Sequence, residues 1–126
     1  MPLSAKRLRE RGFNQALELT HHLIQTIPYK KSNPYALMRR DNLTDNDLHQ
    51  VGSSRSERLT SVKNTFWVPA EQQHLVYGQR VVVIDDVMTT GASLYEAARA
   101  LRAAGASHVI GLVFARTETR QPLERQ

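Results

Sequence analysis

The most constraining stretch of this sequence is Val81–Ser93, where an apolar run is followed by two carboxylates and then by hydroxyl groups around a glycine. The run Val81–Ile84 consists of four β-branched residues, which is typical of a strand buried on both faces in a parallel sheet packed between helices. Apolar residues then recur at helical spacing, at Leu94, Ala97, Ala98 and Leu101. The stretch therefore predicts a strand over 81–85, a polar turn, and a helix over 92–104 that ends at Gly105.

The polar turn has the features of a phosphate site. The backbone N–H groups of residues 90–93 would point out of the first helical turn, where unpaired donors and the positive end of the helix dipole favour an anion. Gly91 permits close backbone approach, and the hydroxyls of Thr89, Thr90 and Ser93 add donors. Charge-assisted hydrogen bonds are worth roughly 1.5–3 kcal/mol each, so several of them would hold a phosphate monoester.

The two carboxylates need a different ligand, because they would repel a phosphate. Ionised Asp85 and Asp86 only accept hydrogen bonds, and the adjacent hydroxyls of a ribose donate them. Either half alone is explained as well by a strand end or a helix cap, but both in this order indicate a ribose 5-phosphate. A P-loop is excluded because the chain has no Gly-x-x-x-x-Gly-Lys-Ser/Thr string, and a receiver domain would place its acidic strand first.

The rest of the chain alternates strands and helices. Asn14 is a plausible N-cap for an amphipathic helix that Pro28 would stop. Further strands are predicted over 35–38, 62–68 and 108–115. We expect 41–61 to be a flexible lid loop and 117–126 a polar tail. This order predicts one domain over 1–126 with an α/β fold, a doubly wound and mainly parallel sheet flanked by helices, and a ligand at the carboxyl ends of its strands.

Composition limits the ligand and the compartment. Seventeen Lys and Arg against twelve Asp and Glu give a charge of +5, which favours a polyanionic partner such as a phosphorylated metabolite or nucleic acid. No cysteine is present, so disulfides and thiolate zinc sites are excluded, and the five histidines show no metal-ligand spacing. No segment has the roughly 18–20 apolar residues of a membrane span, and the start lacks a signal peptide. We therefore expect a cytoplasmic protein.

The stretch 81–93 resembles the signature of type I phosphoribosyltransferases, and the chain as a whole resembles the ComF (competence protein F) group among them. Residues 7–16 are similar to that group's Arg-Gly-Phe-Asn-Gln segment, and residues 115–117 to its terminal strand end. Residues similar to those of its middle loop are Gln50, Arg58 and Phe66. Members usually carry an N-terminal zinc module and an earlier strand, neither of which is found here, so the chain resembles a carboxyl-terminal domain or an open reading frame with a late start.

The resemblance implies a site for 5-phosphoribosyl 1-diphosphate. Asp85 and Asp86 would face the ribose hydroxyls and stabilise positive charge at the anomeric carbon as catalytic residues. The same substrate site would include Val87, Met88, Thr89, Thr90, Gly91, Ala92 and Ser93. A diphosphate loop is expected around residues 4–7, with Lys6, Arg7 and Arg11 as cationic contacts. The expected cofactor is Mg²⁺, which Asp85 and Asp86 would hold indirectly through the ligand.

Two functions follow from the resemblance. The first is a transferase that uses 5-phosphoribosyl 1-diphosphate, although nothing in the sequence specifies its acceptor. The second is a non-catalytic module that binds a phosphoribosyl ligand or handles DNA for the competence machinery. Competence proteins and single-stranded DNA are the macromolecular partners this implies, although no helix-turn-helix or aromatic stacking platform indicates autonomous DNA binding. The oligomeric state stays open.

Overall fold

The computed structural model describes residues 1–28, 36–40 and 62–117. Its elements in chain order are α1 (Ala5–Arg11), α2 (Gln15–Thr26), β1 (Met38–Arg39), β2 (Phe66–Trp67), the 3-10 helix η1 (Ala70–Gln72), α4 (Gln73–Val76), β3 (Arg80–Met88), α5 (Ala92–Ala103) and β4 (His108–Arg116). The predictions of a lid over 41–61 and of a polar tail fall, except for Thr117, outside the described residues.

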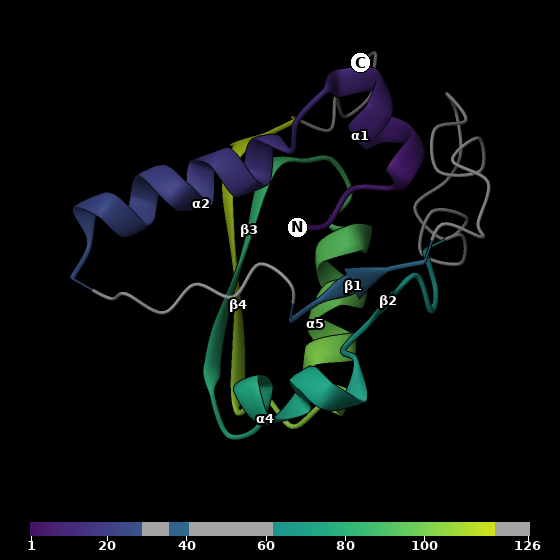
Figure 1. The fold of residues 1–126 in the computed structure, drawn as a ribbon, viewed down its shortest axis with the longest axis vertical. Helices are drawn as coiled ribbons and strands as arrows, with labels where there is room; N and C mark the ends of the chain where they lie inside the picture. Colours follow the sequence, from purple (N-terminus) through teal and green to yellow (C-terminus); the bar gives the residue numbers. More distant parts are fainter. Residues whose placement is uncertain (29–35, 41–61, 118–126) are drawn as a thin grey trace, which may run out of the picture.

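The centre of the fold is the parallel pair of β3 and β4, which α5 connects. Their register runs from Arg80 opposite His108 to Met88 opposite Arg116. Figure 1 shows α5 on one side of this pair and α2 on the other, and α2 contacts β3. This strand–helix–strand unit agrees with the predicted α/β fold class.

One face of α5 forms the core. Ala97 and Leu101 are 0% and 2% exposed, and they pack in one cluster with Val83 of β3 and Phe66 of β2. The short strand β2 pairs antiparallel with β1, and β2 contacts α5. The core is thus built around one helix with small residues on its buried face.

The helix predicted from Asn14 is confirmed, because Asn14 caps α2 by accepting a hydrogen bond from the Leu17 N–H. The left-handed conformation expected of Gly105 after α5 is also present, with φ 96°. Helix α1 was missed: its N-cap is Ser4, whose side chain accepts from the Arg7 N–H at 3.3 Å. The described residues include no helix that is long and apolar enough to cross a membrane.

The expectations for three strands were wrong in detail. The strand predicted over 81–85 continues to Met88, because β4 pairs with it through that residue. It is not buried on both faces, since Val82 is 52% exposed and its partner Ile110 is 49% exposed. The strand predicted over 62–68 is limited to β2. The one predicted over 35–38 shares only Met38 with β1, and residue 35 lies outside the described part.

Candidate phosphoribosyl site

A three-residue turn, 89–91, joins β3 to α5 and places Gly91 at the helix N-cap. Gly91 has φ 80°, a left-handed conformation that other residues rarely adopt. A Cβ at this position would lie 3.5 Å from the Met88 sulfur, which is an ordinary contact, so the glycine is needed for its backbone conformation rather than for space. The turn folds on itself through the Ala92 N–H, which donates to the Thr90 hydroxyl at 3.3 Å.

The start of α5 presents free donors. Within the described part of the chain, the backbone N–H groups of Gly91 and Ser93 have no protein acceptor, and no side chain caps the helix. The first turn of α5 carries no acidic residue. These donors and the positive end of a twelve-residue helix make the turn a favourable place for an anion. The expected donor at Ala92 is instead used inside the turn.

Asp85 and Asp86 lie inside β3 rather than after it. They are neighbours in the strand, and their carboxylates interact, because the Asp86 side chain acts on Asp85 through its charge and through a hydrogen bond. Each receives a local backbone hydrogen bond: the Asp86 N–H donates to Asp85 Oδ1 at 3.1 Å, and the Val87 N–H donates to Asp86 Oδ1 at 2.9 Å. Both carboxylates keep further lone pairs for a ligand.

Two cationic groups lie near this carboxylate pair. The Met1 ammonium donates to the Ile84 carbonyl at 2.6 Å, and the charges of both aspartates favour its protonated form. The Arg11 Nη1 lies 3.9 Å from Asp86 Oδ2. Arg11 is therefore the one predicted cationic contact that the structure brings to the carboxylates.

Burial shifts the pKa values of Asp85 and of the Met1 ammonium. Desolvation raises the pKa of Asp85, and the Asp86 carboxylate adds to this, whereas the Met1 ammonium and the hydrogen bond from the Asp86 N–H oppose it. Desolvation likewise lowers the pKa of the Met1 ammonium, against the attraction of the two aspartates. Asp85 thus holds its proton more tightly than an exposed aspartate does.

Lys6 and Arg7 lie on α1, where a loop was predicted. Ser4 caps this helix, and residues 5–7 form its first turn. No hydrogen bond or ion pair among the described residues links Lys6 or Arg7 to the carboxylates. The expected diphosphate loop is therefore the beginning of a short helix.

The described residues contain no group of three or more His, Cys, Asp and Glu side chains that could hold a metal ion. Two carboxylates near a phosphate site fit an ion that reaches the protein mainly through ligand oxygens, which is how Mg²⁺ is commonly bound. The donor set therefore fits the expected role of Asp85 and Asp86, in which the ligand carries the ion.

Sequence reasoning missed one buried charged group beside the site. Glu96, on α5, is 3% exposed, and it accepts a hydrogen bond from the Asn64 N–H at 2.6 Å and others from Arg99 at 2.7–3.1 Å. It ties residue 64, which has φ 60°, to the helix that carries the phosphate turn. A Glu–Arg pair at i,i+3 is ordinary on exposed helices, so the sequence held no signal of its burial.

Comparison with known proteins places the chain in a family. Residues 14–126 match the family model described as the phosphoribosyl transferase domain. The chain is 30% identical over 109 residues to Competence protein F of Haemophilus influenzae, covering 86% of this chain and 45% of that protein. It is 36% identical over 101 residues to Competence protein ComFC of Bacillus subtilis, covering 80% of this chain and 36% of that protein. The chain thus spans less than half the length of either relative, and no solved structure matches it.

Proposed function

Because this chain belongs to the phosphoribosyl transferase domain family, we propose that residues 81–93 bind 5-phosphoribosyl 1-diphosphate and that the protein serves DNA uptake in competence. The competence role is suggested by the names of its two relatives. One observation supports the ligand assignment most strongly. The turn at Gly91 connects the aspartate pair of β3 directly to the N-terminus of α5, where backbone donors are unused.

In this proposal the 5-phosphate takes the N–H groups of Gly91 and Ser93. The hydroxyls of Thr89, Thr90 and Ser93 complete its shell. The ribose 2- and 3-hydroxyls donate to Asp85 and Asp86, which keeps the carboxylates away from the phosphate. Both groups of contacts are matched in chemistry, because the donors meet an anion and the acceptors meet hydroxyls.

The diphosphate needs cationic partners. Among the described residues, Arg11 is the basic side chain paired with this site, at 3.9 Å from Asp86, and Lys6 and Arg7 lie on the same helix α1. Bound Mg²⁺ would supply charge neutralisation for the diphosphate oxygens. Binding of the ligand would draw Arg11 from the Asp86 carboxylate toward the diphosphate.

The reaction expected at such a site is a displacement at the anomeric carbon. The bond from C1 to the diphosphate oxygen breaks, the diphosphate leaves with the electron pair, and an acceptor nucleophile forms the new bond to C1. Positive charge develops on the ribose ring as this bond breaks, as it does in glycoside cleavage. Asp85 and Asp86 would stabilise that charge in their ionised state.

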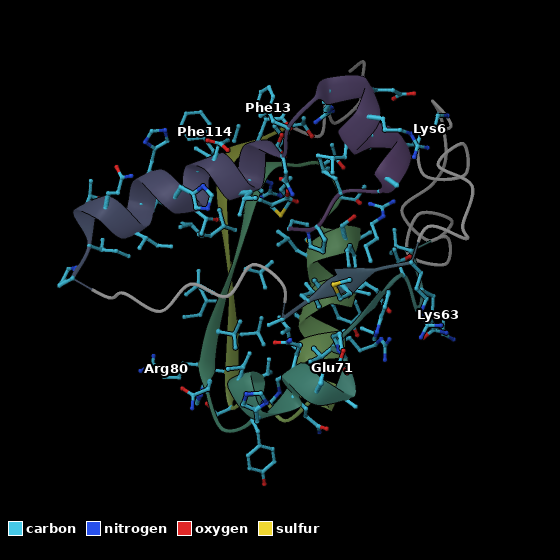
Figure 2. All side chains as sticks on the ribbon, viewed as in Figure 1. Lys6, Phe13, Lys63, Glu71, Arg80 and Phe114 are labelled. Atoms are coloured by element: carbon cyan, nitrogen blue, oxygen red, sulfur yellow. The ribbon has the colours of Figure 1, made fainter. Side chains whose placement is uncertain are left out.

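Calorimetric titration of 5-phosphoribosyl 1-diphosphate with Mg²⁺ tests the ligand assignment. We expect saturable binding by the wild type, and loss of binding in the double variant Asp85→Asn/Asp86→Asn. Glu71→Gln is the matched control, since Glu71 is an exposed carboxylate on η1 (Figure 2). Absence of binding by the folded wild type at millimolar ligand would refute the assignment.

Release of diphosphate, assayed across nucleobases as acceptors, then separates the two functions. Release identifies a transferase, and binding without release for any acceptor favours the non-catalytic module. For DNA handling, affinity for single-stranded DNA should fall steeply with salt, and no binding at low salt would remove that role.

A further inference from the structure

A cavity lies against the C-terminal half of α5, away from the phosphate turn. It has a volume of about 520 Å³ and is formed between α5 and the segment that includes β2, η1 and α4. Ser93 and Arg99, the lining residue of α5 nearest to that turn, are six residues apart on the helix, which corresponds to about 9 Å along its axis. The cavity is thus separate from the proposed phosphoribosyl site and has the size of small-molecule pockets.

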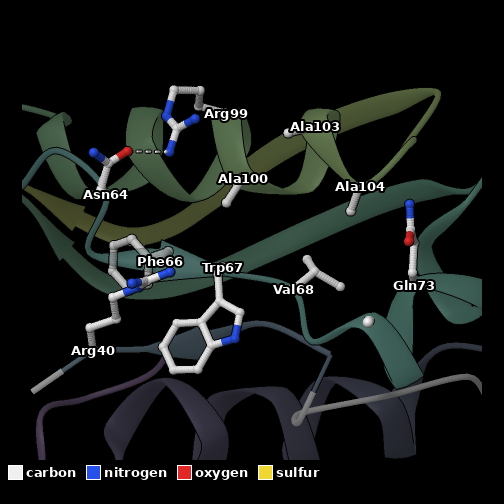
Figure 3. Close-up of a pocket in the computed structure, with 11 residues that line it drawn as sticks. Arg40, Asn64, Phe66, Trp67, Val68, Gln73, Arg99, Ala100, Ala103 and Ala104 are labelled. Atoms are coloured by element: carbon white, nitrogen blue, oxygen red, sulfur yellow. Dashed lines mark hydrogen bonds between the residues drawn. The ribbon is translucent and has the colours of Figure 1, made fainter.

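One wall of this cavity is flat and apolar. Figure 3 shows Ala100, Ala103 and Ala104 on the wall formed by α5, with Val68 across from them, while the indole ring of Trp67 extends from β2 away from α5. Alanine methyl groups leave room for a planar group to lie against the helix, and Trp67 adds apolar surface at the edge of the cavity. This geometry suits a flat ring better than a bulky branched chain.

One end of the cavity is cationic. The Arg40 guanidinium lies 5.1 Å from the centroid of the Trp67 ring, which holds it at the cavity by a cation–π interaction. No ion pair with another described residue neutralises Arg40. In Figure 3 Arg40 and Arg99 lie at the same end, and Gln73 lies at the other.

Arg99 is already fixed in place. Its Nη2 donates to Asn64 Oδ1 at 3.2 Å, and Glu96 balances its charge. The guanidinium group has five N–H donors, so donors remain for a further acceptor. Arg40 therefore supplies the net positive charge at this end, and Arg99 supplies oriented donors.

We propose that this cavity binds a small organic anion that consists of a planar ring bearing a phosphate or a carboxylate. The anionic group would take Arg40 and Arg99, since guanidinium forks match both groups in geometry. The ring would lie against the alanine wall, within the cavity that Trp67 also lines. This site does not depend on the function proposed for residues 81–93.

The sole tryptophan of the chain makes the proposal directly testable, because Trp67 lines the cavity. We would titrate the full chain with phenyl phosphate, benzoate, inorganic phosphate and ribose 5-phosphate, and follow tryptophan fluorescence. Saturable change with phenyl phosphate or benzoate, and none with ribose 5-phosphate, is the expected result. Comparison of phenyl phosphate with benzoate identifies which anionic group the site prefers.

Two variants and a control complete the test. Arg40→Gln should weaken the binding at least about tenfold, as expected for loss of one charge-assisted contact. Ala103→Phe should abolish the binding, because the larger side chain would occupy the space beside the alanine wall. Arg80→Gln removes an exposed arginine elsewhere (Figure 2) and should change nothing.

Binding of 5-phosphoribosyl 1-diphosphate should be unchanged in Arg40→Gln. The proposals for the two sites can therefore be confirmed or refuted independently of each other. No saturable response to either ring compound at millimolar concentration in the folded wild type would overturn the proposal. An equal response to inorganic phosphate alone, or equal binding by Ala103→Phe, would overturn it too, because the ring would then have no part in recognition.

Discussion

Replacing Glu96 by alanine should destabilise the protein by about 2–3 kcal/mol. Glu96 is 3% exposed, and its loss leaves the part-buried Asn64 N–H without its acceptor, which costs about 1–3 kcal/mol. Arg99 adds less, because its side chain is 44% exposed and water can replace the carboxylate. Removing the buried stem of the glutamate adds a packing loss of similar small size.

The isosteric variant Glu96→Gln separates these contributions. Its amide oxygen can still accept from the Asn64 N–H, so the losses are the charge interaction with Arg99 and the hydrogen bond from Arg99 Nε to Oε2, and we expect a cost of about 1 kcal/mol or less because Arg99 is exposed. Urea unfolding followed by circular dichroism gives both values. For a domain of this size, the alanine variant should also melt about 10 °C below the wild type.

Glu71→Ala provides the baseline for an exposed glutamate, and it should lie within about 0.5 kcal/mol of the wild type. If Glu96→Ala were as stable as Glu71→Ala, the buried hydrogen bonds of Glu96 would have no net value. If Glu96→Gln were as unstable as Glu96→Ala, the interaction with Arg99 would account for most of the stability that Glu96 provides. The argument that the exposed Arg99 contributes little would then be refuted.

Two further predictions concern the carboxylate and the turn. Burial raises the pKa of Asp85 in the folded state, so the folded protein binds that proton more tightly than the unfolded chain does. The contribution of Asp85 to the free energy of unfolding therefore falls as the pH rises above the unfolded pKa of 3.8. Asp85→Asn keeps an acceptor for the Asp86 N–H, so relative to wild type it should gain stability at pH 7 compared with pH 4, and urea midpoints that shift equally at both pH values would contradict this. Gly91→Ala should cost about 1 kcal/mol, because φ is 80° while a Cβ meets only the Met88 sulfur at 3.5 Å. Gly91→Asn should cost less when both variants are measured by urea unfolding, and an equal or greater cost would mean that a steric clash rather than the backbone conformation sets the penalty.

The parts of the fold with strong local signals could be predicted from the sequence. The helix beginning after Asn14 combined a capping residue with apolar periodicity, and the turn at Gly91 combined hydroxyls with a glycine between a strand and a helix. Helix α1 lacked such a signal, because a seven-residue basic segment has no apolar stripe. Its one local cue was Ser4 at the N-cap.

The errors arose where tertiary contacts decide the structure. Two aspartates end an apolar run, yet pairing with β4 carries β3 on to Met88. The ammonium of Met1 at Ile84 and the burial of Glu96 both join residues far apart in sequence, at separations of 83 and 32 positions. Local patterns carry no information about contacts of this kind, so the electrostatics of the site had to come from the structure.

The parallel pairing of β3 with β4 also bears on how the chain folds. Every rung joins residues 28 positions apart, from Arg80 with His108 to Met88 with Arg116. The first rung therefore carries nearly all of the loop-closure entropy, about 3 kcal/mol plus a constant, and each later rung closes no additional loop. A slip by one residue would turn Val109 and Val113 away from the α5 face, so the ladder is favoured in a single register. The segment from 80 to 116 is consequently a cooperative unit whose assembly is all or none.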